Sequence, residues 1–321
     1  MQYRDHRFDP RVAVAFAAIY LLWGGTFLAI RVAVLQLPPL FASGARFLVA
    51  GGVLYTFMRL RGHPSPTARQ WRDIAATSLC LFVATYAALF WAEQYVPSGV
   101  ASVIEATLPL TTMVLEVFLF RQEPFSLRMG AALLLGFLGV AWLLIRDQAM
   151  FPAFPCLVIL ASGTAWSLGG VLTRSMRRPR SLPLTAGAQM LLGGLMLLAL
   201  SQASGELRTL PDVTPRAVAA LLYLIVPGSL LGFTAYIWLL ARMPVTRVAS
   251  HAYVNPMVAL GLAYFVGGEA LTPAMLVASG LVIASVILIL KAPRARKQAI
   301  AARANPGHTE ENSYGCQSVA R

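Results

Sequence analysis

Long apolar stretches of about twenty residues alternate along this chain with short polar segments that contain Pro, Gly and Arg. Each stretch is long enough to cross about 30 Å of hydrocarbon as an α-helix. We therefore predict an all-α membrane protein with ten transmembrane helices, at residues 12–35, 38–58, 73–95, 97–120, 127–146, 152–174, 182–204, 217–240, 244–267 and 273–291.

Composition agrees with this pattern. Apolar residues make up 58% of the chain and charged residues 12%, whereas a soluble domain has roughly 25% charged residues. The first apolar stretch is too long for a signal peptide and has no small-residue cleavage site, so we expect it to remain as a helix. The three cysteines, Cys80, Cys156 and Cys316, have no metal-ligand spacing. No metal and no cofactor is therefore expected.

The basic side chains are distributed unevenly between the two sides of the predicted membrane. Of the 26 Lys and Arg residues, 21 lie in segments on the side of the N-terminus, three lie on the other side and two lie within spans. This distribution places both termini in the cytoplasm and leaves no basic surplus for a nucleic-acid partner. Residues 1–11 are then a cytoplasmic N-terminal segment, and residues 292–321 a disordered basic and polar cytoplasmic tail beside the lipid bilayer.

The second half of the chain repeats features of the first half at a nearly constant offset. Trp23 recurs as Trp166, 143 residues later, and the segments "ASGARFLVAGG" and "TAGAQMLLGGL" keep the same offset. Pro109 recurs as Pro256, 147 residues later. We predict two five-helix repeats, at 12–146 and 152–291. Because five is odd, the second repeat should be inverted relative to the first, about a pseudo-two-fold axis in the membrane plane.

Several short motifs resemble one known family. "LWGGTFLAIR" in the first span, "ARFLVA" in the second, and the endings "FRQEP" and "VGGEALT" are similar to those of EamA-type members of the drug/metabolite transporter superfamily. The resemblance implies a ten-helix secondary transporter of a bacterial inner (plasma) membrane that exports amino acids or related small metabolites. It also implies that the fifth and tenth helices are peripheral and that the other eight surround a cavity between the repeats.

The residues themselves also favour a transporter. Two inverted repeats can exchange conformations around a site near the membrane midplane, which is what alternating access requires. No phosphate-binding loop for ATP is present. An intramembrane enzyme is one alternative, but no clustered nucleophile, acid–base pair or metal motif is visible. A scaffold or sensor is another alternative, although it gives no reason for inverted symmetry.

Polar, aromatic and proline residues near mid-span are the candidates for the site. Trp23 and Trp166 lie too deep for an interfacial belt, so they either line the cavity or pack in the core. A proline within a span frees a backbone carbonyl, which must face the protein interior or a wet cavity. The candidate cavity residues are Trp23, Arg46, Glu105, Trp166, Gln189, His251, Tyr253 and Asn255, with helix kinks at Pro109 and Pro256. Asn255 either contacts solute or satisfies the interrupted helix.

Arg46 and Glu105 are the two charges that most need a partner. Each is about eight residues, or ~12 Å, from the outer end of its span, and Gln189 is the counterpart of Arg46 in the second repeat. We expect Arg46 to bind a solute carboxylate or a protein acid, with Glu105 at matching depth as a possible pair. The pair is either a static link between helices or one that opens so that Glu105 binds a proton, the candidate coupling ion.

Three charges at span ends are expected to have structural roles. Arg31 can extend its side chain to the headgroups, and Glu123 and Glu269 suit helix capping better than transport chemistry. The paired glycines, such as Gly51 and Gly52, are expected at close helix contacts.

Overall fold

The computed structural model describes residues 10–120, 127–146, 152–177, 179–208, 213–243, 248 and 251–290. Within these ranges the chain is helical and contains no β-strand. Residues 1–9, Glu123 and the predicted tail at 292–321 lie outside the described residues.

The helices follow the predicted apolar stretches. In chain order they are α1 (Pro10–Val34), α2 (Pro39–Leu60), α3 (Ala68–Ser78), the π-helix η1 (Leu79–Ala84), α4 (Thr85–Ala92), α5 (Ser98–Glu105), α6 (Leu108–Val114), the π-helix η2 (Leu115–Leu119), α7 (Leu127–Arg146), α8 (Ala153–Ser175), α9 (Leu182–Ser204), the 3₁₀-helix η3 (Glu206–Arg208), α10 (Pro215–Tyr223), the π-helix η4 (Leu224–Phe233), α11 (Thr234–Leu240), α13 (His251–Phe265) and α14 (Pro273–Leu290).

Eight segments of the described chain are long and apolar enough to cross a membrane, and two shorter apolar helices, within α13 and α14, follow them. Together they correspond to the ten predicted spans. The third span differs most from its prediction because it begins at Ala68 rather than residue 73. The first residues of the predicted ninth span, 244–247, lie outside the described residues.

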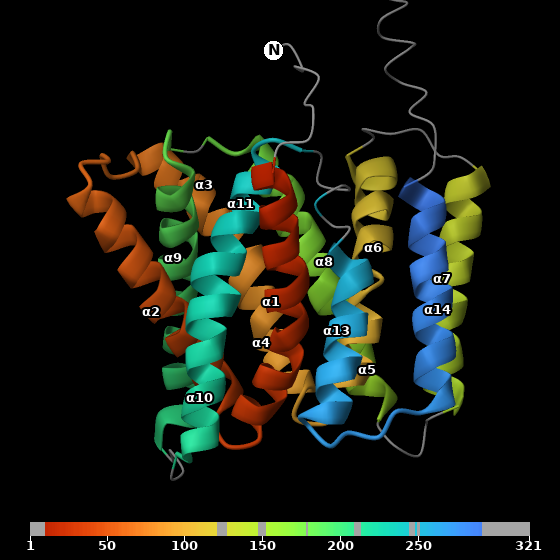
Figure 1. The fold of residues 1–321 in the computed structure, drawn as a ribbon. Coiled ribbons are helices and arrows are strands. Elements are labelled where there is room, and N and C mark those ends of the chain that lie inside the picture. The colour runs from red at the N-terminus through yellow and green to blue at the C-terminus, as the bar shows by residue number, and fades with distance from the viewer. Residues whose placement is uncertain are drawn as a thin grey trace, which may run out of the picture.

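Successive spans run in alternating directions through the bundle (Figure 1). We call the end at which α1 begins and α14 ends the upper end, as in Figure 1, and the opposite end the lower end. In this view α8 begins at the lower end, so the first helices of the two halves start at opposite ends of the bundle.

Local signals in the sequence account for several helix ends. The Thr67 hydroxyl accepts from the Gln70 amide while the Gln70 side chain accepts from the Thr67 amide, which is a capping box at the start of α3. At the start of α9 the Ser181 hydroxyl accepts from the Leu184 amide, which is a simple N-cap. Gly205 ends α9 at φ +82°, a left-handed conformation that suits glycine.

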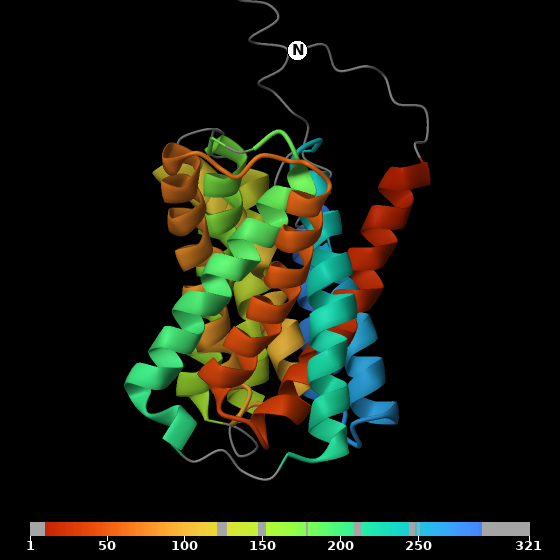
Figure 2. The same ribbon diagram turned by 90° about the vertical axis from the view of Figure 1, so that its left-hand side faces the viewer.

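The two halves are joined by contacts between corresponding helices. The second helices, α2 and α9, pack against each other along one face of the bundle (Figure 2). The fifth helices, α7 and α14, pair at the opposite edge (Figure 1). The first helix of each half packs on the third and fourth spans of the other: α1 on α10, η4, α11 and α13, and α8 on α4, η1, α5 and α6.

Glycines permit the close approach of α2 and α9, and their contacts are reciprocal. A Cβ added at Gly51 would lie 2.2 Å from the Leu191 amide nitrogen, and one added at Gly194 would lie 2.3 Å from that of Leu48. Both members of the second contact are related to those of the first by the offset of 143 residues. Small residues at such a contact let two backbones meet and gain dispersion energy.

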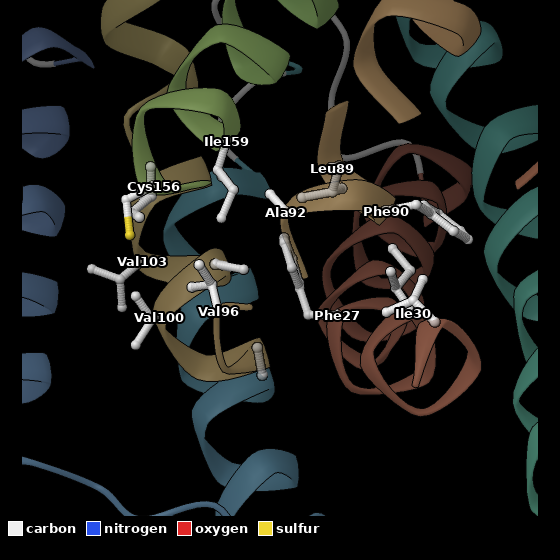
Figure 3. Packing of buried hydrophobic residues seen from close by; sticks show 14 of the residues in the cluster. Phe27, Ile30, Leu89, Phe90, Ala92, Val96, Val100, Val103, Cys156 and Ile159 are labelled. Carbon is white, nitrogen blue, oxygen red and sulfur yellow. The ribbon is translucent and has the colours of Figure 1, made fainter. Parts of the chain in front are cut away.

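A cluster of buried apolar side chains fills the lower half of the bundle (Figure 3). Phe27 and Ile30 of α1 contribute to it with Leu89 of α4, Val100 of α5 and Ile159 of α8. These side chains come from both halves of the chain, so burial of this cluster holds the halves together near the lower end.

The glycine contact gives a direct test of helix packing. We expect Gly51→Ala to lower the free energy of unfolding by about 1–3 kcal/mol, because the added methyl group overlaps the α9 backbone. Gly52→Ala is the matched control, since a Cβ there meets nothing within 4 Å. Thermal unfolding of both purified variants in one detergent measures the difference, and equal stability would contradict the packing described above.

Candidate functional site

A cavity of about 60 Å³ lies inside the bundle. It has room for several water molecules, because one water needs about 10–15 Å³. Spans one, three, four, six and nine line the cavity, and α7 and α14 contribute nothing to it. The lining residues are Trp23, Thr26, Phe27, Ile30, Thr85, Tyr86, Leu89, Ser102, Glu105, Ala106, Leu108, Trp166, His251, Ala252 and Asn255.

The two tryptophans at equivalent positions of the repeats meet in this lining. Their rings are 5.5 Å apart in an edge-to-face arrangement, which is a favoured geometry for aromatic pairs. Trp23 Nε1 donates a hydrogen bond of 2.9 Å to the carbonyl of Gly228 in η4. Tyr236 completes the aromatic group, at 5.3 Å from Trp23 and 5.1 Å from Trp166. One wall of the cavity is therefore built by both halves.

Glu105 lies in the cavity wall where the fourth span is interrupted. Pro109 has no amide hydrogen to donate to the Glu105 carbonyl, so α5 ends at Glu105 and α6 begins at Leu108. The carboxylate accepts a hydrogen bond of 2.5 Å from Ser162 Oγ of α8. A Cβ at Gly163 would lie 3.2 Å from Glu105 Oε2, so the absent side chain leaves room for the carboxylate.

His251 and Asn255 lie one turn apart on α13 and face the cavity together. The Asn255 amide is best oriented with its oxygen accepting from His251 Nδ1 and its nitrogen donating to the Tyr20 carbonyl of α1, at 3.1 and 3.0 Å. This network assigns the proton to Nδ1 and leaves Nε2 as an acceptor. Nε2 is buried and has no hydrogen-bond partner among the residues that the structure describes. The His251 ring is 4.9 Å from that of Trp23.

Arg46 is not among the cavity-lining residues, and it does not form an ion pair with Glu105. Its side chain is 1% exposed, with Nε donating to Ser229 Oγ at 2.8 Å. The guanidinium carbon lies 4.5 Å from the centre of the Phe47 ring and 4.9 Å from that of Tyr86. Because Tyr86 lines the cavity, Arg46 lies one layer behind the wall.

Gln189 is also placed away from the cavity lining. Its Nε2 donates to Thr77 Oγ1 at 2.8 Å and to Thr173 Oγ1 at 3.2 Å, so it links α9 to α3 and α8. The side chain of Tyr253 lies outside the described residues. Both prolines are buried, but whereas the fourth span breaks before Pro109, α13 continues through Pro256 as one helix.

Three expectations about span ends can be compared with the structure. Glu269 accepts from the amides of Ser98 and Gly99, at 3.1 Å each, and therefore caps α5 as expected. Arg31 donates to the main-chain carbonyl of Glu93, so it has a protein partner as well as a place near the end of α1. Glu123 lies outside the described residues.

The sequence interpretation missed Tyr86, Ser102 and Ser162. The sequence could have indicated Ser102, because it precedes Glu105 by three residues and shares its helix face. Ser162 is one of several hydroxyls in apolar helices, and its role depends on contact with another span. Tyr86 belongs to an apolar run that gives no sign of which face it occupies.

The bundle of long apolar helices around an internal cavity is that of a polytopic helical membrane protein, and comparison with known proteins gives its class, a membrane transporter. The EamA-like transporter family matches this chain twice, over residues 11–145 and 153–291. The chain belongs to the EamA-like transporter family.

Named relatives extend over most of the chain. The "Uncharacterized inner membrane transporter YedA" of Escherichia coli K12 is 34% identical over 86% of this chain and 89% of its own length. Protein PecM of Dickeya dadantii is 29% identical over 84% and 88%. A "Probable amino-acid metabolite efflux pump" of Salmonella typhimurium is 26% identical over 88% and 95%.

A solved structure shares the fold. It superposes with a TM-score of 0.64, covering 88% of this chain and 97% of its own, at 18% sequence identity. At this level of identity the similarity concerns the fold alone.

The surroundings of Arg46 predict that its guanidinium cannot be replaced by an ammonium group. We expect Arg46→Lys to lose about 1.5–3 kcal/mol of stability, the contribution of a hydrogen bond to a charged group, because Lys cannot keep both the Ser229 bond and the flat contact with Tyr86. The control is Arg59→Lys, at an exposed position on the same helix. Unchanged thermal unfolding of Arg46→Lys would contradict this interpretation.

Proposed function

We propose that this protein is a secondary transporter that exports amino acids or related small amino-bearing metabolites through the cavity by alternating access. The observation that carries the proposal is the position of Glu105 in a cavity between the two halves, where its carboxylate has no ion-pair partner within the described part of the chain. The name of the Salmonella typhimurium relative supports the solute class, and the family match supports transport.

Alternating access rests on an inverted relation between residues 12–146 and 152–291. Three observations support that relation: α1 and α8 start at opposite ends of the bundle (Figure 1), the family matches each half separately, and the α2–α9 contacts are reciprocal. In the reciprocal set, Gly44 meets Leu198 as Gly187 meets Tyr55, again with both members offset by 143. Such reciprocity is typical of a two-fold axis.

The direction of transport requires an orientation in the membrane. The excess of Lys and Arg on the side of the N-terminus supports a cytoplasmic upper end, with both termini inside the cell. The printed name of YedA supports an inner-membrane location. Export then moves solute from the upper to the lower end.

The cavity chemistry suits a solute with an ammonium group. Glu105 supplies negative charge, His251 Nε2 supplies an acceptor, and the faces of Trp and Tyr rings attract cations. A proton and an ammonium group would compete for Glu105, so that release of one permits binding of the other. This competition is the proposed basis of proton-coupled exchange. It takes the place of the Arg46–Glu105 ion pair that the similar depths of the two residues predicted.

The experiment is efflux from proteoliposomes loaded with a panel of amino acids and nucleosides, measured at two pH values. We expect Glu105→Gln to slow efflux of the transported amino acid about tenfold, since a hydrogen bond to a charged group contributes about 1.5–3 kcal/mol. The efflux rate of Glu105→Gln should also be the same at the two pH values.

Glu206→Gln is the matched control, because Glu206 accepts from the Leu40 and Phe41 amides at the start of α2, outside the cavity lining. Efflux by Glu105→Gln that is as fast and as pH-dependent as that of the unaltered protein would remove the proposed role of Glu105. Absence of efflux for the whole panel would remove the solute class.

A further inference from the structure

Glu93 is a buried carboxyl group that the cavity does not use. It directly follows α4, and its side chain is 0% exposed. Among the described residues neither carboxyl oxygen has a hydrogen-bond partner, and Glu93 forms no ion pair. An ionised carboxylate in such a place is very costly, so burial favours the neutral form of Glu93.

The position of Glu93 connects it to the cavity. Tyr86, Leu89 and Glu93 are three and four residues apart, a spacing that places them along one helix face. Tyr86 and Leu89 line the cavity, so Glu93 is the next side chain of that face toward the lower end. On α5, Ser102 lines the cavity and Ser98, one turn nearer the lower end, donates to Glu269 at 2.7 Å.

Arg31 contacts Glu93 but does not neutralise its carboxylate. Arg31 Nη1 donates instead to the main-chain carbonyl oxygen of the same residue. The Arg31 and Glu269 side chains are both partly exposed. Movement of Arg31 from the carbonyl to the carboxylate would pair the two charges, and the partly exposed Arg31 and Glu269 would give Glu93 a route to the lower end.

The charged groups acting on Glu93 come from several elements. They are Glu269 after α13, Arg31 of α1, Glu105 of α5 and Arg46 of α2. The carboxylates favour the neutral form of Glu93 and the two arginines favour the ionised form. A change in the distance to Arg31 or Glu269 would thus shift the balance between the two forms.

We propose that Glu93 is a second proton-binding site, through which a proton passes between Glu105 in the cavity and the lower end of the bundle. In the buried position seen in this structure Glu93 holds the proton as a neutral acid. When the lower end opens, the O–H bond breaks, the proton passes to water and Arg31 pairs with the carboxylate. The reverse steps load the proton for transfer to Glu105. This role rests on the proposed transport function.

The neutral acid can be detected directly by infrared spectroscopy. We expect the purified protein in lipid to show the C=O stretch of a protonated carboxyl group at neutral pH, and Glu93→Gln to lose part of that band. Glu206→Gln is the control and should keep the band whole. The spectrum of Glu105→Gln shows how much of the band comes from the Glu105 carboxyl group in the cavity. A Glu93→Gln spectrum equal to that of the unaltered protein would overturn the proposal.

A second variant tests the proposal even if Glu93→Gln does not fold. Arg31→Gln removes the cation that stabilises ionised Glu93, so the Glu93 band should persist to higher pH than in the unaltered protein. A band that disappears at the same pH in both proteins would contradict the proposed exchange of partners.

Proton movement can be measured with a pH-sensitive dye inside proteoliposomes, using the amino acid that gives the fastest efflux. We expect Glu93→Gln to reduce solute-dependent proton flux to the level of protein-free liposomes while solute exchange at equal pH continues. Unchanged proton flux would refute the passage through Glu93. The infrared result does not require transport, so it stands even if no member of the panel is exported.

Discussion

Hydrocarbon offers no hydrogen bonds, so polar side chains inside the bundle depend on partners from the protein itself. Helices satisfy the backbone, and several buried side chains are held by contacts within the bundle. Arg46 finds Ser229 and two aromatic rings, and Gln189 finds two threonines. Glu105 finds Ser162. These bonds fix helices that apolar contacts alone would leave free to rotate, because lipid is as apolar as leucine.

Much of the fold follows from the sequence, because the membrane imposes one length scale and one dominant signal. Apolar stretches of the right length predicted the helices, and the recurrence of Trp23 as Trp166 pointed to two residues that do meet in space. His251 and Asn255, which lie deep within their predicted span, line the cavity of this structure. The depth of a residue within its span and the recurrence of residues at a constant offset can both be derived from one sequence.

The direction in which a side chain points around its helix is much harder to predict. Arg46 and Glu105 have similar depths, yet one lies behind the aromatic wall and the other lies in it. Rotation of each span is set by packing against neighbours, which the sequence of that span does not specify. Ser162 could not be predicted for the same reason, because its hydroxyl has a role only through the contact of α8 with Glu105. Glu93 was overlooked because it lies at the predicted boundary of the third span, where acidic residues are common.

The reciprocal contacts between α2 and α9 resemble those across a homodimer interface. In a homodimer of identical halves, every substitution appears twice, so a change that helps one side of the contact alters the other side as well. Joining the halves into one chain removes that restriction. Position 46 carries Arg and the equivalent position 189 carries Gln, and the two side chains bind different partners. The chain can thus keep the symmetry of its backbone contacts while the chemistry of its two halves diverges.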